Sequence, residues 1–321
     1  MPVNFLRFSV GFSDSNKTTN VTSVTARGEV MKKFSLMRGA TIALATASLV
    51  LATAVSAGAS GTTGKFNAGA AKLVPAMYKG ITLQVGSDAT YAPDESMNGT
   101  TMVGFDVDLI NAIATTLGIK VVENNVTFDN ILPGIADGRY AIGNSSFTDN
   151  AKRQKQVNFV DYFQAGEGVY AKASSTLKFK KLSSFCGLKV AVETGTVEQT
   201  DAAAVKCMGG KKVTVQSYST QTEANVAVSS GQADVGFLDS QIAGYVVSQS
   251  SGAFKLLGSA VNVAPYGIAT AKTTDGKKFA KAIQAALKVL VKNGTYKAIL
   301  KKYGVQAGAL KSSQIVLNGG H

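Results

Sequence analysis

The chain has 321 residues, of which 45% are hydrophobic and 17% are charged, and its formal net charge is +13 at pH 7. This composition is that of a globular protein that can bury a substantial core, and the length fits one or two domains. The lysines are scattered rather than interleaved with stacking aromatic residues, so the positive charge indicates a solvated surface and argues against nucleic-acid binding.

Residues 31–59 have the pattern of a secretory signal peptide. A basic stretch containing Lys32 and Lys33 precedes an apolar core at residues 40–55, and small residues that permit cleavage follow. The alternative is a membrane anchor, which a core this short and rich in Ala and Thr supports poorly. We therefore expect export and removal of this segment.

Residues 1–30 lack apolar periodicity and precede the methionine at which the signal pattern begins. We expect them to be an upstream extension, either disordered or the product of a misplaced start. No cysteine lies near the cleavage site, so a lipid-modified N-terminal cysteine is not expected. The mature protein is predicted to be periplasmic or secreted and not a lipoprotein.

The chain has two cysteines, Cys186 and Cys207. In an exported protein an isolated pair indicates a disulfide more often than a metal site. Closing a loop of this length would stabilise the fold by about 3 kcal/mol in the chain-entropy model. Two unpaired buried thiols are the alternative.

From residue 81 onward, strand-like and helix-like segments alternate. The strands end in polar residues, and the helices have apolar positions at helical spacing and end near glycines. This order predicts a parallel, mostly buried sheet. Strands are expected at 81–88, 119–126 and 139–146, with helices at 105–118 and 128–138.

A second series follows a connecting stretch at 160–175, with strands at 188–193, 212–218 and 233–238 and helices after Thr196, at 222–231 and after Asp239. Residues 262–272 cross back, and two amphipathic helices, broken at Asn293 and Gly294, occupy 276–304. Two crossings imply an α/β fold of two lobes, each a mostly parallel sheet flanked by helices, joined by a two-stranded hinge. We predict a discontinuous first lobe, 80–168 plus 265–321, and a second lobe, 169–264.

Polar residues that end strands are the candidates for function, because ligands of open parallel sheets bind outside the carboxyl ends of the strands. Arg153, with Ser145, Ser146 and Thr148 nearby, makes a plausible carboxylate site, since a guanidinium binds a carboxylate through two hydrogen bonds. The alternative is a solvated arginine beside Lys152.

Thr196 and Gln199 stand at capping-box spacing at the start of a predicted helix, after Gly195. Free amides at this end of a helix favour an anion, although a simple cap would have the same sequence. Asp239 ends an apolar strand and could either cap the next helix or pair with a cation.

Asp88 presents the same two alternatives as Asp239, at the end of the first strand. Tyr91 and Phe128 could be core residues or the walls of a flat pocket.

Taken in order, these segments resemble the family 3 solute-binding proteins of ABC transporters for polar amino acids. The resemblance covers roughly residues 80–305, and eight matching segments in sequence are a specific signal. The segments are "VGSDATYAP", "GFDVDLINAIATTLG", "FDNILPGIADGRY", "SSFTDNAKRQKQVNFVDYF", "VAVETGTVEQ", "GQADVGFLDS", "PYGIA" and "NGTYKAILKKYG".

The resemblance implies a type II periplasmic binding protein fold, in which two lobes close on one amino acid and deliver it to a membrane permease. Carried onto this chain, it implies three groups of ligand contacts. The carboxylate would be bound by Arg153, Ser146, Thr148, Thr196 and Val197; the ammonium by Asp239 and Ser146; and the side chain by Asp88, Tyr91, Phe128, Ser145 and Glu193.

Several positions depart from the family pattern, and two of them are at expected ligand contacts. Val197 replaces a common threonine, which removes a hydroxyl and keeps the backbone amide. Glu193 stands where relatives carry an apolar, amide or basic residue. If it faces the cleft beside Asp88, the two acids would favour a basic or amide side chain and disfavour an acidic one. If it faces solvent, it has no such role.

The resemblance implies a permease of an ABC transporter and a free amino acid as partners, contact with the membrane only through the permease, a monomer and no cofactor. The main rival is an enzyme similar to cyclohexadienyl dehydratase on the same fold, for which Glu193 is the one candidate acid. The single histidine is His321, and no metal-ligand spacing is present. A ligand-binding sensor module is the third alternative.

Overall fold

A computed structural model describes residues 62–321 of the chain. The predicted signal peptide at 31–59 and the upstream extension at 1–30 lie outside the described residues. Within 62–321, the helices are too short or too polar to cross a membrane.

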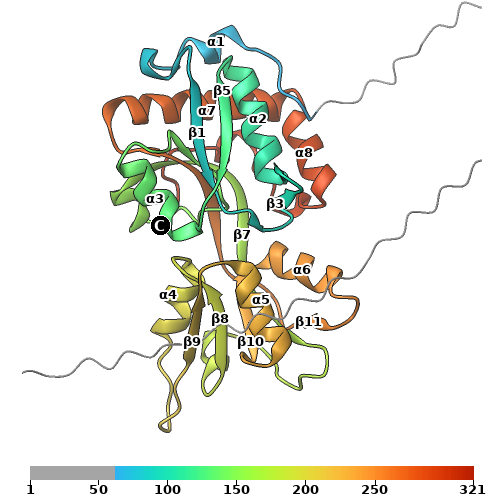
Figure 1. Cartoon of the computed structure of the whole chain (residues 1–321). Helices are drawn as coiled ribbons and strands as arrows, with labels where there is room; N and C mark the ends of the chain where they lie inside the picture. Colours follow the sequence, from blue (N-terminus) through green and yellow to red (C-terminus); the bar gives the residue numbers. More distant parts are fainter. Residues whose placement is uncertain (1–61) are drawn as a thin grey trace, which may run out of the picture. The chain divides into compact units, whose positions relative to one another are not determined.

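The first lobe combines two separate stretches of the chain (Figure 1). Its sheet strands β5, β1 and β6 are parallel, and α2 packs against α7 and α8 in one apolar core. Gly118 ends α2 with a positive φ of 67°, which glycine adopts without strain. The elements are α1 (Ala68–Ala71), β1 (Thr82–Ser87), α2 (Phe105–Leu117), β5 (Lys120–Asn125), α3 (Phe128–Ala136), β6 (Ile142–Gly143), α7 (Thr274–Lys292) and α8 (Thr295–Tyr303).

The second lobe is continuous in sequence between the two hinge strands. Strands β10, β8 and β9 are parallel, and capped helices connect them. Thr220 and Glu223 form a reciprocal capping box that starts α5. The elements are β8 (Lys189–Glu193), α4 (Val197–Ala204), β9 (Thr214–Tyr218), α5 (Gln221–Ser230), β10 (Val235–Asp239), α6 (Ser240–Gln249) and β11 (Phe254–Leu256).

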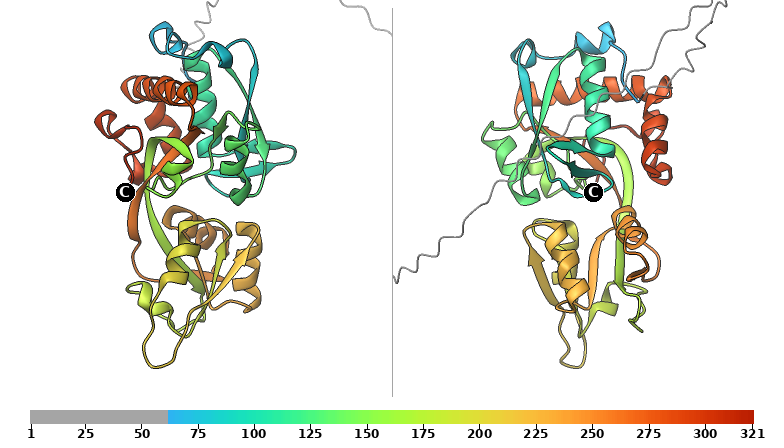
Figure 2. Two further views of the ribbon diagram at one scale, coloured as in Figure 1. Left: turned by 90° about the vertical axis from the view of Figure 1, so that its left-hand side faces the viewer. Right: turned by 45° about the vertical axis from the view of Figure 1, so that its right-hand side comes forward.

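Two long antiparallel strands join the lobes. Strand β7 (Val157–Lys172) pairs with β12 (Val261–Ala271), which in turn pairs with β6 of the first lobe, and β7 pairs with β10 of the second. The path β5-β1-β6-β12-β7-β10-β8-β9 is therefore one continuous sheet. Figure 2 shows this pair of strands passing between the two groups of helices. The predicted two-lobed α/β fold with a two-stranded hinge is confirmed.

Several local predictions differ from the structure. The expected strand at 139–146 is only two residues long, and the stretch at 160–175, predicted as a connection, is mostly strand. A small separate sheet was not predicted, formed by β2 (Thr90–Tyr91), β3 (Glu95–Asn98) and β4 (Thr101–Val103). Residues before 80 also belong with the first lobe, because Val74 and Tyr78 lie in its core.

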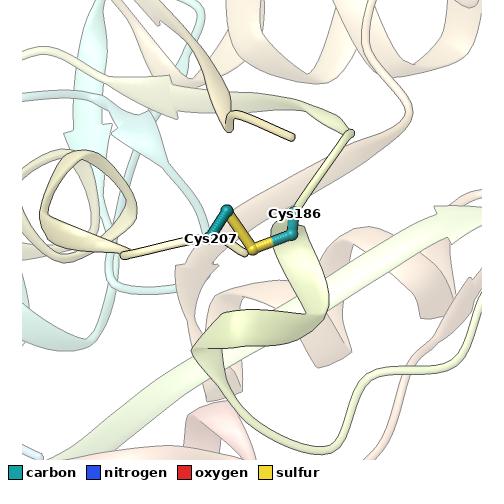
Figure 3. Close-up of a disulfide and its surroundings, with 2 residues drawn as sticks. All are labelled: Cys186 and Cys207. Carbon is teal, nitrogen blue, oxygen red and sulfur yellow. A yellow bond between two sulfur atoms is a disulfide. The ribbon is translucent and has the colours of Figure 1, made fainter. Parts of the chain in front are cut away.

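Short 3-10 helices occupy Ala76–Tyr78, Arg153–Lys155, Leu182–Phe185, Gln306–Gly308 and Ser312–Gln314. The predicted disulfide is present: Cys186 and Cys207 are bonded, with 5.6 Å between their Cα atoms (Figure 3). It joins the segment before β8 to the segment after α4, within the second lobe. Of the two readings of the cysteine pair, the structure supports the disulfide.

Candidate functional site

The carboxyl ends of β1, β6, β8 and β10 surround one cavity between the lobes. The space between its walls is about 290 Å³, including the part open to solvent. Every ligand-contacting residue predicted from the sequence lines this cavity, and one unpredicted residue joins them. The lining consists of Asp88, Tyr91, Phe128, Ser145, Ser146, Thr148, Arg153, Glu193, Thr196, Val197, Glu198 and Asp239.

Arg153 is only 8% exposed, so it is not the solvated arginine that the sequence left as an alternative. Its guanidinium donates to the carbonyl oxygen of Thr148 (2.8 Å) and, across the cleft, to that of Gly195 (3.0 Å). It also lies 5.3 Å from the ring centre of Phe128 and 5.4 Å from that of Phe147. These contacts fix the plane of the guanidinium.

Burial lowers the pKa of Arg153 to about 10, so the side chain remains cationic at neutral pH. Among the described residues, no carboxylate lies within ion-pair distance of it. A buried cation without a paired anion is unfavourable, and an incoming carboxylate relieves that cost. Arg153 is therefore suited to bind an anionic group.

Helix α4 begins next to Arg153. The Thr196 hydroxyl accepts from the amide of Gln199 (3.2 Å) and donates to the carbonyl of Glu193 (2.8 Å). The predicted capping box is incomplete, because the Gln199 side chain accepts from the Gly195 amide (2.8 Å) rather than from that of Thr196. Val197 is the first residue of α4, and its apolar side chain leaves only a backbone amide for a ligand.

Asp239 precedes α6 but makes no side-chain capping bond. Its carboxylate accepts from the hydroxyl of Tyr91 in the first lobe (2.8 Å), and its amide donates to the same oxygen (3.1 Å). Burial raises the pKa of Asp239 to about 6, so it is mostly ionised at neutral pH. The capping alternative is therefore wrong, and the carboxylate faces the cavity.

Two further acids meet at another part of the cavity wall. Asp88 accepts from the amide and hydroxyl of Thr90 (2.9 and 2.7 Å) and from the amide of Phe128 (2.9 Å). Glu193 is 2% exposed and accepts from the amide of Gln221 (3.0 Å), and the charge of Asp88 adds to burial in raising its pKa. Glu193 thus lines the cavity and does not face solvent.

Phe128 and the two serines take fixed positions around these charges. Phe128 stacks on Phe147 with 4.5 Å between ring centres, so it is both a core residue and a cavity wall. Ser145 accepts from the amide of Asp88 (2.9 Å). Ser146 adopts a positive φ of 48°, held by its amide bond to Asp106 (2.9 Å) and its hydroxyl bond to Asp94 (2.9 Å).

Glu198 is the lining residue that the sequence did not indicate. It is 2% exposed, and its Oε1 atom has no hydrogen-bond partner among the described residues. Burial, followed by the charge of Asp239, holds its pKa well above the ordinary value. An acid in the first turn of a helix normally faces solvent, so only the packing of the lobes could reveal it.

Within residues 62–321, the acidic and sulfur-bearing side chains form no cluster suited to a metal ion. The chemistry of the cavity is that of charge recognition: one guanidinium and several carboxyl groups enclose a small space. That arrangement fits a small molecule that carries both signs of charge.

Residues 83–306 match the model of the bacterial extracellular solute-binding proteins, family 3. The arginine-binding protein ArgT of Corynebacterium glutamicum is 30% identical over 239 residues, which are 73% of this chain and 77% of that protein. The lysine/arginine/ornithine-binding periplasmic protein of Escherichia coli K12 is 28% identical, covering 69% and 87% of the two chains.

Among solved structures, an ancestral arginine-binding protein bound to arginine superposes with a TM-score of 0.64 at 32% identity, covering 69% of this chain and 97% of that one. The family consists of binding proteins, so the dehydratase alternative is not supported. The chain belongs to family 3 of the bacterial extracellular solute-binding proteins.

Proposed function

We propose that this protein captures an amino acid with a basic side chain between its two lobes and delivers it to the permease of an ABC transporter. The observation that carries the proposal is the charge pattern of one cavity: a buried guanidinium, Arg153, with carboxyl groups on both lobes. The relatives named above bind arginine, or lysine, arginine and ornithine, which agrees with that pattern.

In this proposal, Arg153 binds the ligand carboxylate together with Thr148, Ser146 and the first amides of α4 at Thr196 and Val197. Asp239 takes the ammonium, next to Ser146. Both charges of an amino acid must be paired when the cleft closes, because an unpaired buried charge costs several kcal/mol. The partners lie on different lobes, so a ligand with both charges favours the closed form.

The ligand side chain would lie toward Asp88 and Glu193, between Tyr91 and Phe128 and near Ser145. Two acids there favour a guanidinium or ammonium group over an amide, and they repel a carboxylate. Arginine, lysine, ornithine and histidine are therefore the candidate ligands. Glutamine is placed below them, and glutamate and aspartate are excluded.

The remaining parts of the proposal concern the context of the protein. We infer that it acts outside the cytoplasmic membrane after removal of a signal peptide, without a lipid anchor, as a monomer that meets the membrane through its permease. We also retain lobe boundaries near residues 168 and 265. They fall within β7 and β12, which run through both lobes without interruption.

A thermal-shift screen of the twenty amino acids with ornithine and citrulline tests the ligand class. A ligand that binds only the folded protein raises Tm, by an amount that grows with its concentration above Kd. We expect arginine, lysine or ornithine to give the largest shifts and glutamate none. A largest shift with glutamate or aspartate would overturn the proposal, as would no shift with any of the compounds.

A further inference from the structure

Asp88 and Glu193 line the same cavity, and each is 2% exposed. The amide of Gln221 donates both to Glu193 (3.0 Å) and to the Thr90 hydroxyl (3.2 Å), which in turn donates to Asp88 (2.7 Å), so the two carboxyl groups belong to one buried cluster. Two carboxylates buried in one cluster repel each other, and a proton on one of them relieves the repulsion. We therefore expect the pair to hold one proton before a ligand binds.

The hydrogen bonds of the two groups indicate which of them carries the proton. Asp88 accepts three bonds, two from Thr90 and one from the amide of Phe128, and such bonds favour the ionised form. Glu193 accepts one, from the amide of Gln221. Glu193 is therefore the protonated partner. Burial, followed by the charge of Asp88, raises the pKa of Glu193 to about 9, in agreement with this assignment.

The neighbouring elements offer the pair no compensating cation. The titratable groups around Glu193 are Asp88 after β1, Asp129 of α3, Tyr91 of β2, Tyr218 of β9 and Glu198 of α4. Among the described residues, neither Asp88 nor Glu193 forms an ion pair with a lysine or arginine. The cation of the cavity is Arg153, whose guanidinium bonds to Thr148 and Gly195.

We propose that the Asp88–Glu193 pair recognises a cationic ligand side chain by exchanging the proton on Glu193 for the ligand's charge. On binding, the O–H bond of Glu193 breaks, the proton passes to the solvent, and the guanidinium or ammonium group lies against two carboxylates. This inference rests on the proposed function. It adds that one proton is released for each cationic ligand bound.

A neutral ligand of the same shape cannot make this exchange. An amide or urea group can donate to Asp88, but it carries no charge with which to stabilise a second carboxylate, so Glu193 keeps its proton. Citrulline, in which a urea replaces the guanidinium of arginine, is the neutral control ligand for arginine. The proton is thus a means of telling a cationic side chain from a neutral one.

The sign of the pH dependence follows. Ionised Glu193 is the form that binds the cation, and in the empty site its pKa is about 9. Raising the pH toward that value reduces the cost of losing the proton, so the affinity for arginine should rise, by up to about tenfold per pH unit. The affinity for citrulline should gain nothing from this group.

Isothermal titration calorimetry of the full protein near neutral pH, in buffers of different ionisation enthalpy, counts the protons released. We expect about one for arginine and none for citrulline. Glu193→Gln should abolish the release with arginine, since the amide has nearly the same shape as the protonated acid and has no proton to lose. Glu223→Gln, at an exposed acid on α5, is the control and should keep it.

Equal proton counts for arginine and citrulline would overturn the inference, as would release that persists in Glu193→Gln. These results differ from a failure of the proposed function, in which arginine gives no binding isotherm at all and both conclusions fall. Circular dichroism and Tm of the empty variants show whether each is folded before its proton count is interpreted.

Discussion

Replacing Arg153 by alanine tests the charge pairing most directly. The substitution removes a buried guanidinium that lies against Phe128 and Phe147 and bonds to the carbonyls of Thr148 and Gly195. The ligand carboxylate would then enter the closed cleft without its cation. Leaving one charge of a buried pair without its partner costs about 2 to 5 kcal/mol.

That cost corresponds to a loss of affinity between about 30-fold and about 5,000-fold. Arg153→Lys keeps the charge but loses the planar pair of donors, so we expect an intermediate loss. The measurement is calorimetric Kd for the best ligand of the thermal-shift screen. Lys155→Ala, two residues away at an exposed cation, is the matched control and should bind as the parent does.

The fold should tolerate the change, because the cost of burying the guanidinium disappears together with its hydrogen bonds. The empty variant should therefore keep its circular dichroism spectrum. A folded Arg153→Ala protein that binds within about threefold of the parent would refute the assignment of the carboxylate site. Equal losses in Arg153→Ala and Lys155→Ala would indicate long-range attraction by surface charge instead.

Three other substitutions test separate features. Asp239→Asn should weaken binding by about 2 to 5 kcal/mol in calorimetry, since the ammonium loses its anion; unchanged Kd would contradict this role. Gln241→Ala removes the hydrogen bonds from α6 to Asp94 and Tyr266, which hold the lobes together. Small-angle scattering of the protein without ligand should then show a larger radius of gyration. An unchanged radius would mean that these bonds do not hold the lobes together. Replacing Cys186 and Cys207 by serine should lower the free energy of unfolding by about 3 kcal/mol in urea titrations, because the unfolded chain gains the entropy of the opened loop. An equally stable variant would contradict this explanation.

The elements within each lobe were predictable because local signals agree there with the tertiary fold. Helix α2 has apolar positions on one face and ends at Gly118, and α5 starts with a capping box. Strands β7 and β12 lack such a signal. Strand β7 is buried along nearly its whole length and contains two glycines, so it shows no alternation of apolar and polar residues.

The cavity lining was predictable for a different reason. Parallel strands direct their carboxyl ends to one edge, so a polar residue that follows an apolar strand is a candidate whatever the details of packing. Asp88 and Asp239 were found in this way. Glu198 lies in the first turn of α4 and does not follow a strand, so this rule could not find it. Asp88 and Glu193 likewise come from different lobes, 105 positions apart in the sequence, and line the same cavity.

The divided first lobe has a consequence for the order in which the chain can fold. The apolar face of α2, including Phe105 and Leu109, belongs to the same core as Phe279 and Ile283 of α7, more than 160 positions later in the sequence. The second lobe is contiguous, and its buried core residues lie between Val169 and Leu257, so this core can assemble before α7 is made. A nascent chain that ends before α7 therefore leaves the apolar face of α2 exposed, and such a surface is prone to aggregation until the last helices are made.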